Sequence, residues 1–227
     1  DKYLPFKPKP YSEVIHPSPN EFSVKYNHNR EGFRDTDKNY EKPLNTYRIL
    51  GLGDSFTFGV GVDFEKTYLY SLEQLLNEKL SENKVEIIKA GINRFWTEPE
   101  RILLEHYGVK YKPDLILLGL TANDILDTFY GVDAVTVDDS GYLLTREAKS
   151  LGTFARFLFN NSALSRLFLK TYVSHLVSKN NPRKPFEDIY KSNGFYDKYI
   201  RKVELEILKM RKIAQSIGSQ FAIIYIP

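Results

Sequence analysis

Short apolar runs alternate with amphipathic segments along most of this 227-residue chain, and this alternation constrains its fold more than any other feature. The apolar runs predict buried parallel strands, and the leucine-rich segments between them predict helices. Strands are expected at residues 48–53, 85–88, 115–120 and 221–226, and helices at residues 67–80, 98–107, 154–177 and 199–216. This order indicates right-handed βαβ units and therefore an α/β fold with a parallel sheet.

The first 46 residues follow a different pattern. They are rich in proline, asparagine, lysine and tyrosine. Five prolines oppose both helix and central strand here, namely Pro5, Pro8, Pro10, Pro17 and Pro19. We therefore expect residues 1–46 to form an extended arm packed on one domain of residues 47–227. Within the arm, residues 31–35 are expected to form a turn that is anchored by Phe33.

Parallel sheets bind ligands at the carboxyl ends of their strands, so the turn after each apolar run is a candidate site. The first run ends in Gly53, Asp54 and Ser55. A serine that leaves a strand through glycine can expose its hydroxyl beside backbone N–H groups, which suits an acyl-transfer nucleophile. The alternative is that these residues only cap a helix. Thr57 excludes the Gly-x-Ser-x-Gly elbow, and no Walker loop follows.

The next two strand ends carry hydrogen-bond donors. Gly91 follows the second run and can bring its backbone N–H close to a ligand, although a glycine there can also simply make a turn. Asn123 follows the third run and can donate from its carboxamide, although it can also cap the next helix. Together with Ser55, these two residues predict a nucleophile with donors for a tetrahedral oxyanion.

These residues resemble the motifs of the SGNH hydrolase superfamily, the GDSL-like esterases and lipases, in its bacterial type. Gly53-Asp54-Ser55 matches the first motif, and Gly91 matches the second. Residues 121–124 match the third, with Thr121 where many members have glycine, and residues 32–35 resemble a stretch that precedes the first motif in some bacterial members.

The resemblance implies a flavodoxin-like three-layer α/β/α sandwich and the hydrolysis or transfer of ester-linked acyl groups. It implies that Ser55 is the nucleophile. Its own N–H, the N–H of Gly91 and the amide of Asn123 would form the oxyanion hole, and Asp54 and Asp124 would support them. No cofactor is implied.

The sequence departs from the family in one respect, because the Asp-x-x-His motif that supplies the base and its orienting acid is absent. We therefore expect the C-terminal part of the domain to be missing and these residues alone to show little or no esterase activity. The four histidines are expected to be surface or packing residues: His16, His28, His106 and His175. Of these, His28 is the closest to a substitute base, because an arm can fold over a cleft.

Composition excludes several other classes. The chain has no cysteine, so it has neither disulfides nor thiolate metal sites. Its net charge of +3 comes without a basic stripe, which argues against nucleic-acid binding. We expect no metal, because three aspartates fit a hairpin turn around Ser140 and Gly141 instead, namely Asp133, Asp138 and Asp139. No dinucleotide loop is present either.

No apolar run reaches the length of about 20 residues that a transmembrane helix requires. An extracytoplasmic location is favoured over a cytoplasmic one, and the sequence sets no oligomeric state. The leading hypothesis is a serine-dependent ester hydrolase acting on an acyl ester such as an O-acylated carbohydrate or a lipid. Residues 127–185, with their aromatic and leucine content, are expected to wall the site. Two alternatives stay open: a non-catalytic carbohydrate- or partner-binding module on the same scaffold, and a cell-envelope polysaccharide O-acyltransferase.

Overall fold

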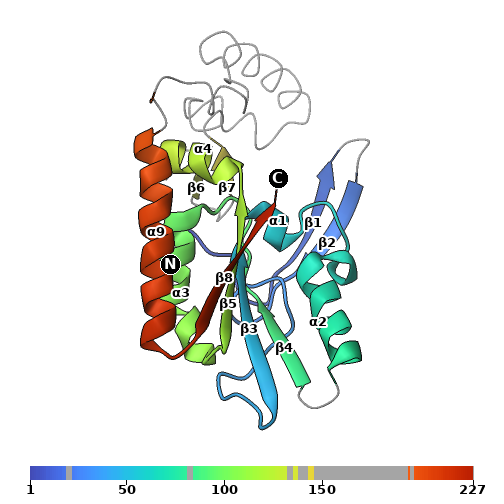
Figure 1. The fold of residues 1–227 in the computed structure, drawn as a ribbon. Coiled ribbons are helices and arrows are strands. Elements are labelled where there is room, and N and C mark those ends of the chain that lie inside the picture. Colours follow the sequence, from blue (N-terminus) through green and yellow to red (C-terminus); the bar gives the residue numbers. More distant parts are fainter. Residues whose placement is uncertain are drawn as a thin grey trace. The chain divides into compact units, whose positions relative to one another are not determined.

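A four-stranded parallel sheet forms the centre of the computed structural model (Figure 1). Its strands are β3 (Thr46–Gly53), β4 (Lys84–Lys89), β5 (Leu115–Thr121) and β8 (Gln220–Ile226). They lie in the order β4-β3-β5-β8, so the chain moves outward from β3 in one direction and then in the other. This is the flavodoxin-like strand order, and it creates a switch point between β3 and β5 where ligands bind in such folds.

The structure describes residues 1–18, 22–80, 84–131, 135–137, 143–145, 194 and 197–226. The chain divides into two compact units, Asp1–Phe129 with Lys198–Pro227, and Tyr130–Asp197. The first unit contains the sheet and the candidate site, and we describe it first. The expected division into an arm of residues 1–46 and a domain of residues 47–227 stays a prediction.

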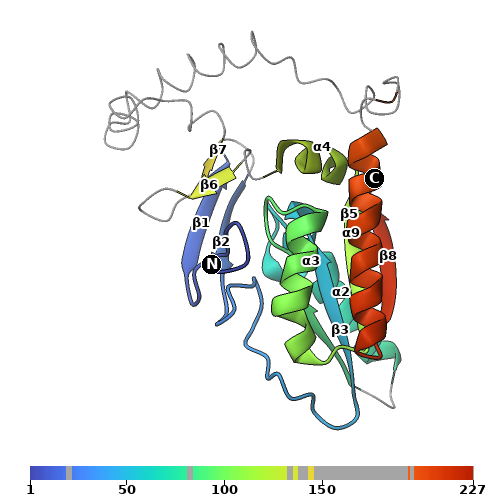
Figure 2. The same ribbon diagram turned by 90° about the vertical axis from the view of Figure 1, so that its left-hand side faces the viewer.

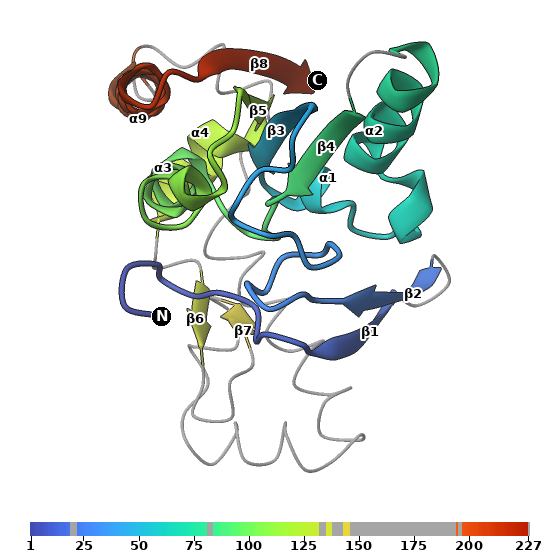
Figure 3. The same ribbon diagram turned by 90° about the horizontal axis from the view of Figure 1, so that it is seen from below.

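Helices cover both faces of the sheet, which gives the three layers of an α/β/α sandwich (Figure 3). One face carries α2 (Tyr68–Lys79), which follows the short helix α1 (Ser55–Phe58) and the 3-10 turn η1 (Phe64–Lys66). The other face carries α3 (Thr97–His106), the 3-10 turn η2 (Gly108–Tyr111) and α9 (Asp197–Ser216). An ion pair between Arg101 of α3 and Glu206 of α9 links the two helices on that face.

The core follows from the alternation of side chains along β3. Ile49 packs with Leu69 of α2, Ile87 and Leu117 in a buried apolar cluster on one face. Leu50 points to the opposite face, where it approaches Gly108. Because both faces are covered, β3 exposes almost no side chain after its second residue. Burial on both faces explains why the strand is a continuous apolar run rather than an alternating one.

The expected strands and helices of the first unit are confirmed to within three residues at each end. The helix expected at residues 154–177 falls on residues that the structure does not describe. A further helix, α4 (Asn123–Tyr130), begins at Asn123 itself, so Asn123 is the first helical residue rather than the cap. In the described part of the chain, no helix combines the length and the apolar character that a membrane crossing requires.

The N-terminal arm contains a β-hairpin that its composition does not predict (Figure 2). Strands β1 (Glu13–Ser18) and β2 (Phe22–Asn27) pair antiparallel. Pro17 is tolerated in β1 because a two-stranded ribbon has only edges, where the missing N–H can face outward. The rest of the arm packs on the domain through buried side chains, Leu4, Phe6 and Phe33.

Arg34 connects the arm to the helix that carries the candidate nucleophile. Its guanidinium is buried and donates to the carbonyl oxygens of Phe58, Gly59 and Val62 at 3.1, 2.7 and 2.7 Å. These carbonyls belong to the end of α1 and the turn that follows, where helix carbonyls lack intrahelical partners. The guanidinium also lies 4.5 Å from the centre of the Tyr26 ring, so one residue ties hairpin, arm and α1 together.

The second unit is described only at a short hairpin. Strands β6 (Val135–Val137) and β7 (Leu143–Thr145) pair antiparallel, with Val137 opposite Leu143. This pairing confirms the hairpin expected around Ser140 and Gly141, although the connecting residues themselves lie outside the described part. Most of the segment expected to wall the site, residues 127–185, also lies outside it.

Replacing Arg34 with alanine should lower the free energy of unfolding by about 3 kcal/mol, because it removes a buried guanidinium that donates to the carbonyl oxygens of Phe58, Gly59 and Val62. Urea unfolding followed by circular dichroism measures this change. The matched control is Lys66→Ala, which removes an exposed ion pair with Asp63 from a nearby turn and should leave the free energy of unfolding almost unchanged. Equal costs for the two variants would contradict the anchoring role of Arg34.

Candidate active site

The turn after β3 depends on a glycine. Gly53 has φ of +152°, and a Cβ atom there would lie 2.0 Å from Thr57 Oγ1 and 3.0 Å from the carbonyl oxygen of Gly119. No other residue fits this close approach without moving α1 away from the sheet. Thr57 is itself buried, and its hydroxyl lies 3.1 Å from the Tyr68 hydroxyl of α2. The turn therefore fixes α1 against both the sheet and α2.

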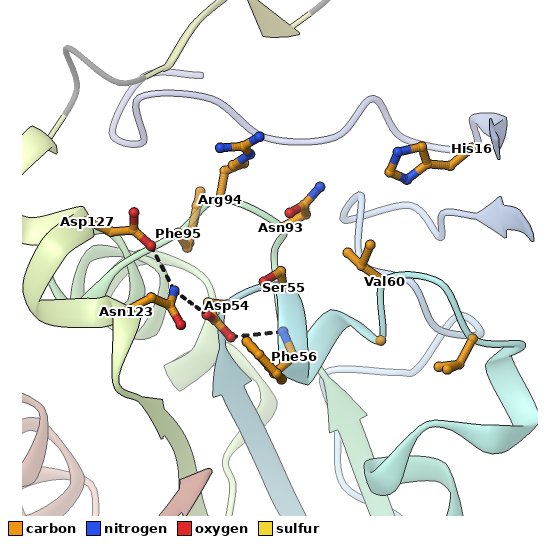
Figure 4. Close-up of a pocket in the computed structure, with 12 residues that line it drawn as sticks. His16, Asp54, Ser55, Phe56, Val60, Asn93, Arg94, Phe95, Asn123 and Asp127 are labelled. Carbon is orange, nitrogen blue, oxygen red and sulfur yellow. Dashed lines mark hydrogen bonds between the residues drawn. The ribbon is translucent and has the colours of Figure 1, made fainter. Parts of the chain in front are cut away.

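Ser55 is the first residue of α1, and it does not cap the helix. The cap is Asp54, whose side chain accepts a hydrogen bond from the Phe56 N–H at 2.9 Å. Neither the hydroxyl nor the N–H of Ser55 has a hydrogen-bond partner among the described residues. The alternative role of helix cap thus falls to Asp54, and Ser55 keeps its hydroxyl available at the carboxyl end of β3 (Figure 4).

Gly91 lies directly against α1. A Cβ atom at Gly91 would lie 2.7 Å from the backbone nitrogen of Phe58 and 2.7 Å from the carbonyl carbon of Thr57. The chain beside it is held to β3 because the N–H of Ile92 donates to the carbonyl of Gly53 at 3.0 Å. The N–H of Gly91 has no acceptor among the described residues. Close packing against α1 therefore requires glycine at position 91. This requirement is separate from the predicted role of its N–H as a donor.

Asn123 approaches the same turn from β5. Its Nδ2 donates to Asp54 Oδ2 at 2.9 Å and to Asp127 Oδ2 at 2.8 Å, as the dashed lines in Figure 4 show. It makes no capping bond to the backbone of α4. The carboxamide lies where the sequence predicts it, yet both of its protons already have acceptors.

An open cavity of about 590 Å³ is lined by both Ser55 and Asn123, whereas Gly91 is not among its lining residues (Figure 4). Ser55 lies on its floor, and the cavity borders are made by β1, α1, the loop after β4 and α4. The apolar part of the lining includes the exposed ring of Phe56 and the side chains of Val60 and Val62. Its charged part includes Arg94 and Asp127. The volume lies in the range that small-molecule sites occupy.

Thr121, which departs from the family pattern, has a clear structural role. Its hydroxyl lies 3.0 Å from Asp54 Oδ2 and 3.2 Å from Asp124 Oδ2. The Thr121 N–H also donates to Asp124 Oδ2 at 2.7 Å. A hydroxyl has one proton to give, so it satisfies both contacts when Asp124 is protonated and donates to it in turn. Burial raises the pKa of Asp124 to about 7, which agrees with such an arrangement.

Glu100 of α3 adds a further carboxyl group behind the site. It is fully buried, and neither of its carboxyl oxygens has a hydrogen-bond partner among the described residues. Burial raises its pKa well above the ordinary value, and the negative charges of Asp124 and Asp54 raise it further. Isolated buried charge is costly, so we expect Glu100 to carry a proton near neutral pH.

The histidines differ from expectation in one respect. His16 of β1 lines the cavity, whereas His28 does not. The ring of His16 packs edge-on against Phe22, and its only hydrogen-bond partner in the described part of the chain is the Tyr26 hydroxyl at 3.5 Å. His28 lies 3.0 Å from the Ser12 hydroxyl, and burial lowers its pKa. No described histidine hydrogen-bonds to Ser55.

The described residues offer no metal site, because they contain no group of three or more histidine, cysteine, aspartate or glutamate side chains placed to hold an ion. The buried carboxyl groups near Ser55 are held by backbone, hydroxyl and amide donors instead.

The solved structures that this chain resembles include several esterases. One is AlinE4, an SGNH-hydrolase family esterase, with 18% sequence identity over 78% of this chain and 75% of that chain, at a TM-score of 0.33. Another is a catalytic mutant of Axe2, an acetylxylan esterase from Geobacillus stearothermophilus, with 13% identity over 77% of this chain and 74% of that chain, at a TM-score of 0.33. No protein-family model and no curated protein sequence matches the chain. At these identities the likeness concerns the fold, so the chemistry has to be argued from this chain's own residues.

Sequence reasoning finds the three strand-end residues but misses several of their neighbours. The position of Asp127 could have been predicted from the sequence, because it lies one helical turn after Asn123 and therefore on the same face of α4. The position of Glu100 could also have been predicted, since it shares a helical face with Leu103 and Leu104, which are buried. Arg94 has no comparable signal, because its place depends on the loop after β4.

Replacing Glu100 with glutamine should flatten the dependence of stability on pH. The folded protein binds protons on Glu100 and Asp124 more tightly than the unfolded chain does, so its stability falls as the pH rises from about 4.5 towards 7. The neutral side chain in Glu100→Gln removes one of these protons, so the free energy of unfolding should fall less across this range than in the wild type.

Urea titrations at several pH values test this expectation. The matched control is Glu78→Gln, which neutralises an exposed glutamate on α2 and should keep the wild-type pH dependence. The proton-holding role of Glu100 would be wrong if Glu100→Gln and the wild type lost stability in parallel.

Proposed function

We propose that this protein is a serine-dependent ester hydrolase and that Ser55 is its nucleophile. One observation carries the proposal: Ser55 offers an uncommitted hydroxyl to the cavity while Asp54 performs the capping that serine would otherwise perform. A serine with only a structural role would use its hydroxyl to cap the helix or to pack.

In the proposed reaction, Ser55 Oγ attacks the carbonyl carbon of an acyl ester, and its proton passes to a general base. The carbonyl oxygen becomes an oxyanion, and the N–H groups of Ser55 and Gly91 are the donors for it, with the amide of Asn123 as a third. Collapse of this intermediate releases the alcohol and leaves the acyl group on Ser55. Water then hydrolyses the acyl-enzyme and regenerates the hydroxyl.

The general base is not among the described residues that contact Ser55. A serine hydroxyl is a weak nucleophile without such a base, so the proposal requires one from outside this contact set. The same observation favours the second candidate, a module that binds an ester or carbohydrate without turning it over. Reactivity of Ser55 separates the two, because only the enzyme needs a hydroxyl that attacks an electrophile.

The cavity lining supports a substrate with an apolar or sugar-like face. Phe56 exposes 53% of its surface directly beside Ser55, and Val60 and Val62 line the same cavity. A flat, exposed ring can stack on an acyl chain or on the apolar face of a sugar ring. We therefore propose O-acylated carbohydrates or small lipid esters as substrates. Transfer of the acyl group to a sugar hydroxyl instead of water uses the same residues.

In the protein that includes the general base, a fluorophosphonate probe should form a covalent adduct at Ser55, and Ser55→Ala should abolish the adduct. Mass spectrometry of the intact protein and of its peptides measures both results. The matched control is Ser71→Ala, which removes an exposed serine on α2 and should leave labelling unchanged. Labelling that persists in Ser55→Ala, or that is absent from the wild type, would contradict the proposed ester hydrolase. The non-catalytic binding module would then be the better candidate.

A further inference from the structure

The carboxamide of Asn123 has two protons, and two carboxylates use them. Asp54 Oδ2 and Asp127 Oδ2 lie 2.9 and 2.8 Å from Asn123 Nδ2. A carboxamide nitrogen has no third proton to give. In this arrangement Asn123 therefore has no donor left for the oxyanion of an acyl-transfer reaction.

The carboxylates of Asp54 and Asp127 differ in how easily they can give up their hydrogen bond with Asn123. Asp54 is buried, caps α1 and also accepts from Thr121, so its carboxylate is fixed by three donors from three places. Asp127 lines the open cavity, and Asn123 is its only hydrogen-bond partner among the described residues. The bond that can be exchanged is therefore the one between Asn123 and Asp127.

We infer that Asp127 is a positioning residue that controls access to the oxyanion site: its carboxylate occupies the proton of Asn123 that the oxyanion needs, and it must turn away before Asn123 can act. The inference rests on the proposed ester chemistry at Ser55. A carboxylate in this place has a second effect, because its negative charge also opposes the charge that develops on the substrate oxygen.

Arg94 gives the displaced carboxylate a partner. It lines the same cavity, is exposed, and has neither a hydrogen bond nor an ion pair with the described residues. The backbone of Arg94 has φ of +71°, which is unfavourable for a residue with a side chain. Strained backbone of this kind is common near functional sites. Figure 4 shows Arg94 and Asp127 on the same side of the cavity. Rotation of the Asp127 side chain towards Arg94 would exchange an amide donor for a charged one. Burial raises the pKa of Asp127, and the charge of Arg94 already acts on that carboxyl group electrostatically in the opposite direction.

Two substitutions of Asp127 separate this exchange from a simple change of charge. Asp127→Ala removes both the charge and the acceptor, whereas Asp127→Asn removes the charge but keeps a carbonyl acceptor. The rate of fluorophosphonate labelling at Ser55 should be about tenfold higher in Asp127→Ala than in the wild type, and Asp127→Asn should fall between them. Asp63→Ala, which removes an exposed carboxylate, should label at the wild-type rate.

Equal acceleration by Asp127→Ala and Asp127→Asn would overturn the inference, since charge alone would then account for it. Labelling of Asp127→Ala that is no faster than the wild type would overturn it as well. Failure to label Ser55 in every variant would instead refute the proposed ester chemistry.

The Asn123 side-chain amide supplies a readout that needs no reaction. In nitrogen-15 NMR spectra, identified by their loss in Asn123→Asp, its two proton resonances should differ between the wild type and Asp127→Ala. Added sodium acetate, whose carboxylate oxygen stands in for the oxyanion, should shift them in Asp127→Ala and leave them unchanged in the wild type. Resonances that are identical in the two proteins, or that acetate moves equally in both, would overturn the inference even where Ser55 is reactive.

Discussion

The buried carboxylate of Asp54 holds the candidate site together. It accepts hydrogen bonds from the backbone of Phe56, from the Thr121 hydroxyl and from the Asn123 amide. These donors come from α1, from the end of β5 and from the start of α4, on the two sides of the switch point between β3 and β5. One carboxyl group thus fixes the distance between the turn that carries Ser55 and the turn that carries Asn123. Three donors satisfy the Asp54 carboxyl group, whereas burial raises the pKa of its neighbours Asp124 and Glu100.

The arm secures the same turn from the opposite end. Arg34 satisfies the carbonyls at the end of α1, and Asp35 accepts from the backbone N–H of Lys89 at 3.1 Å, at the end of β4. Lys89 in turn pairs with Glu73 of α2. The turn after β3 is therefore held at its start by Asp54 and at its end by Arg34. Support at both ends fixes the direction of the Ser55 side chain. A candidate nucleophile needs such a fixed direction to meet a bound substrate in the right geometry.

The sequence predicts the sheet well because of what burial demands. Strands covered on both faces are mostly apolar, so residues 49–53 of β3 and 115–120 of β5 stand out as continuous apolar runs, whereas β4 also contains Lys84, Glu86 and Lys89. The placement of Ser55 and Asn123 on one cavity follows from the same logic, since the carboxyl ends of parallel strands share one edge. Capping could not be assigned beforehand, because Asp54 and Ser55 are both good caps and only the turn geometry decides between them.

Other features depend on contacts between distant parts of the chain. The bond between Arg34 and the end of α1 spans 24 to 28 residues, and nothing in the local pattern around Arg34 indicates it. The hairpin in the arm forms although Pro17 opposes most strands, because an edge tolerates it. Asp127 becomes significant only when the two protons of Asn123 are counted against their acceptors. Sequence patterns predict which elements form, whereas hydrogen-bond accounting at a site requires coordinates.

The central claim is that Ser55 and the N–H groups around it converge on one small anion. A crystal structure of the protein with a phosphonate bound covalently to Ser55 tests it most directly. The claim predicts a phosphonyl oxygen within about 2.7–3.1 Å of the backbone nitrogens of both Ser55 and Gly91. A phosphonyl oxygen that points into solvent, with neither nitrogen in reach, would contradict it.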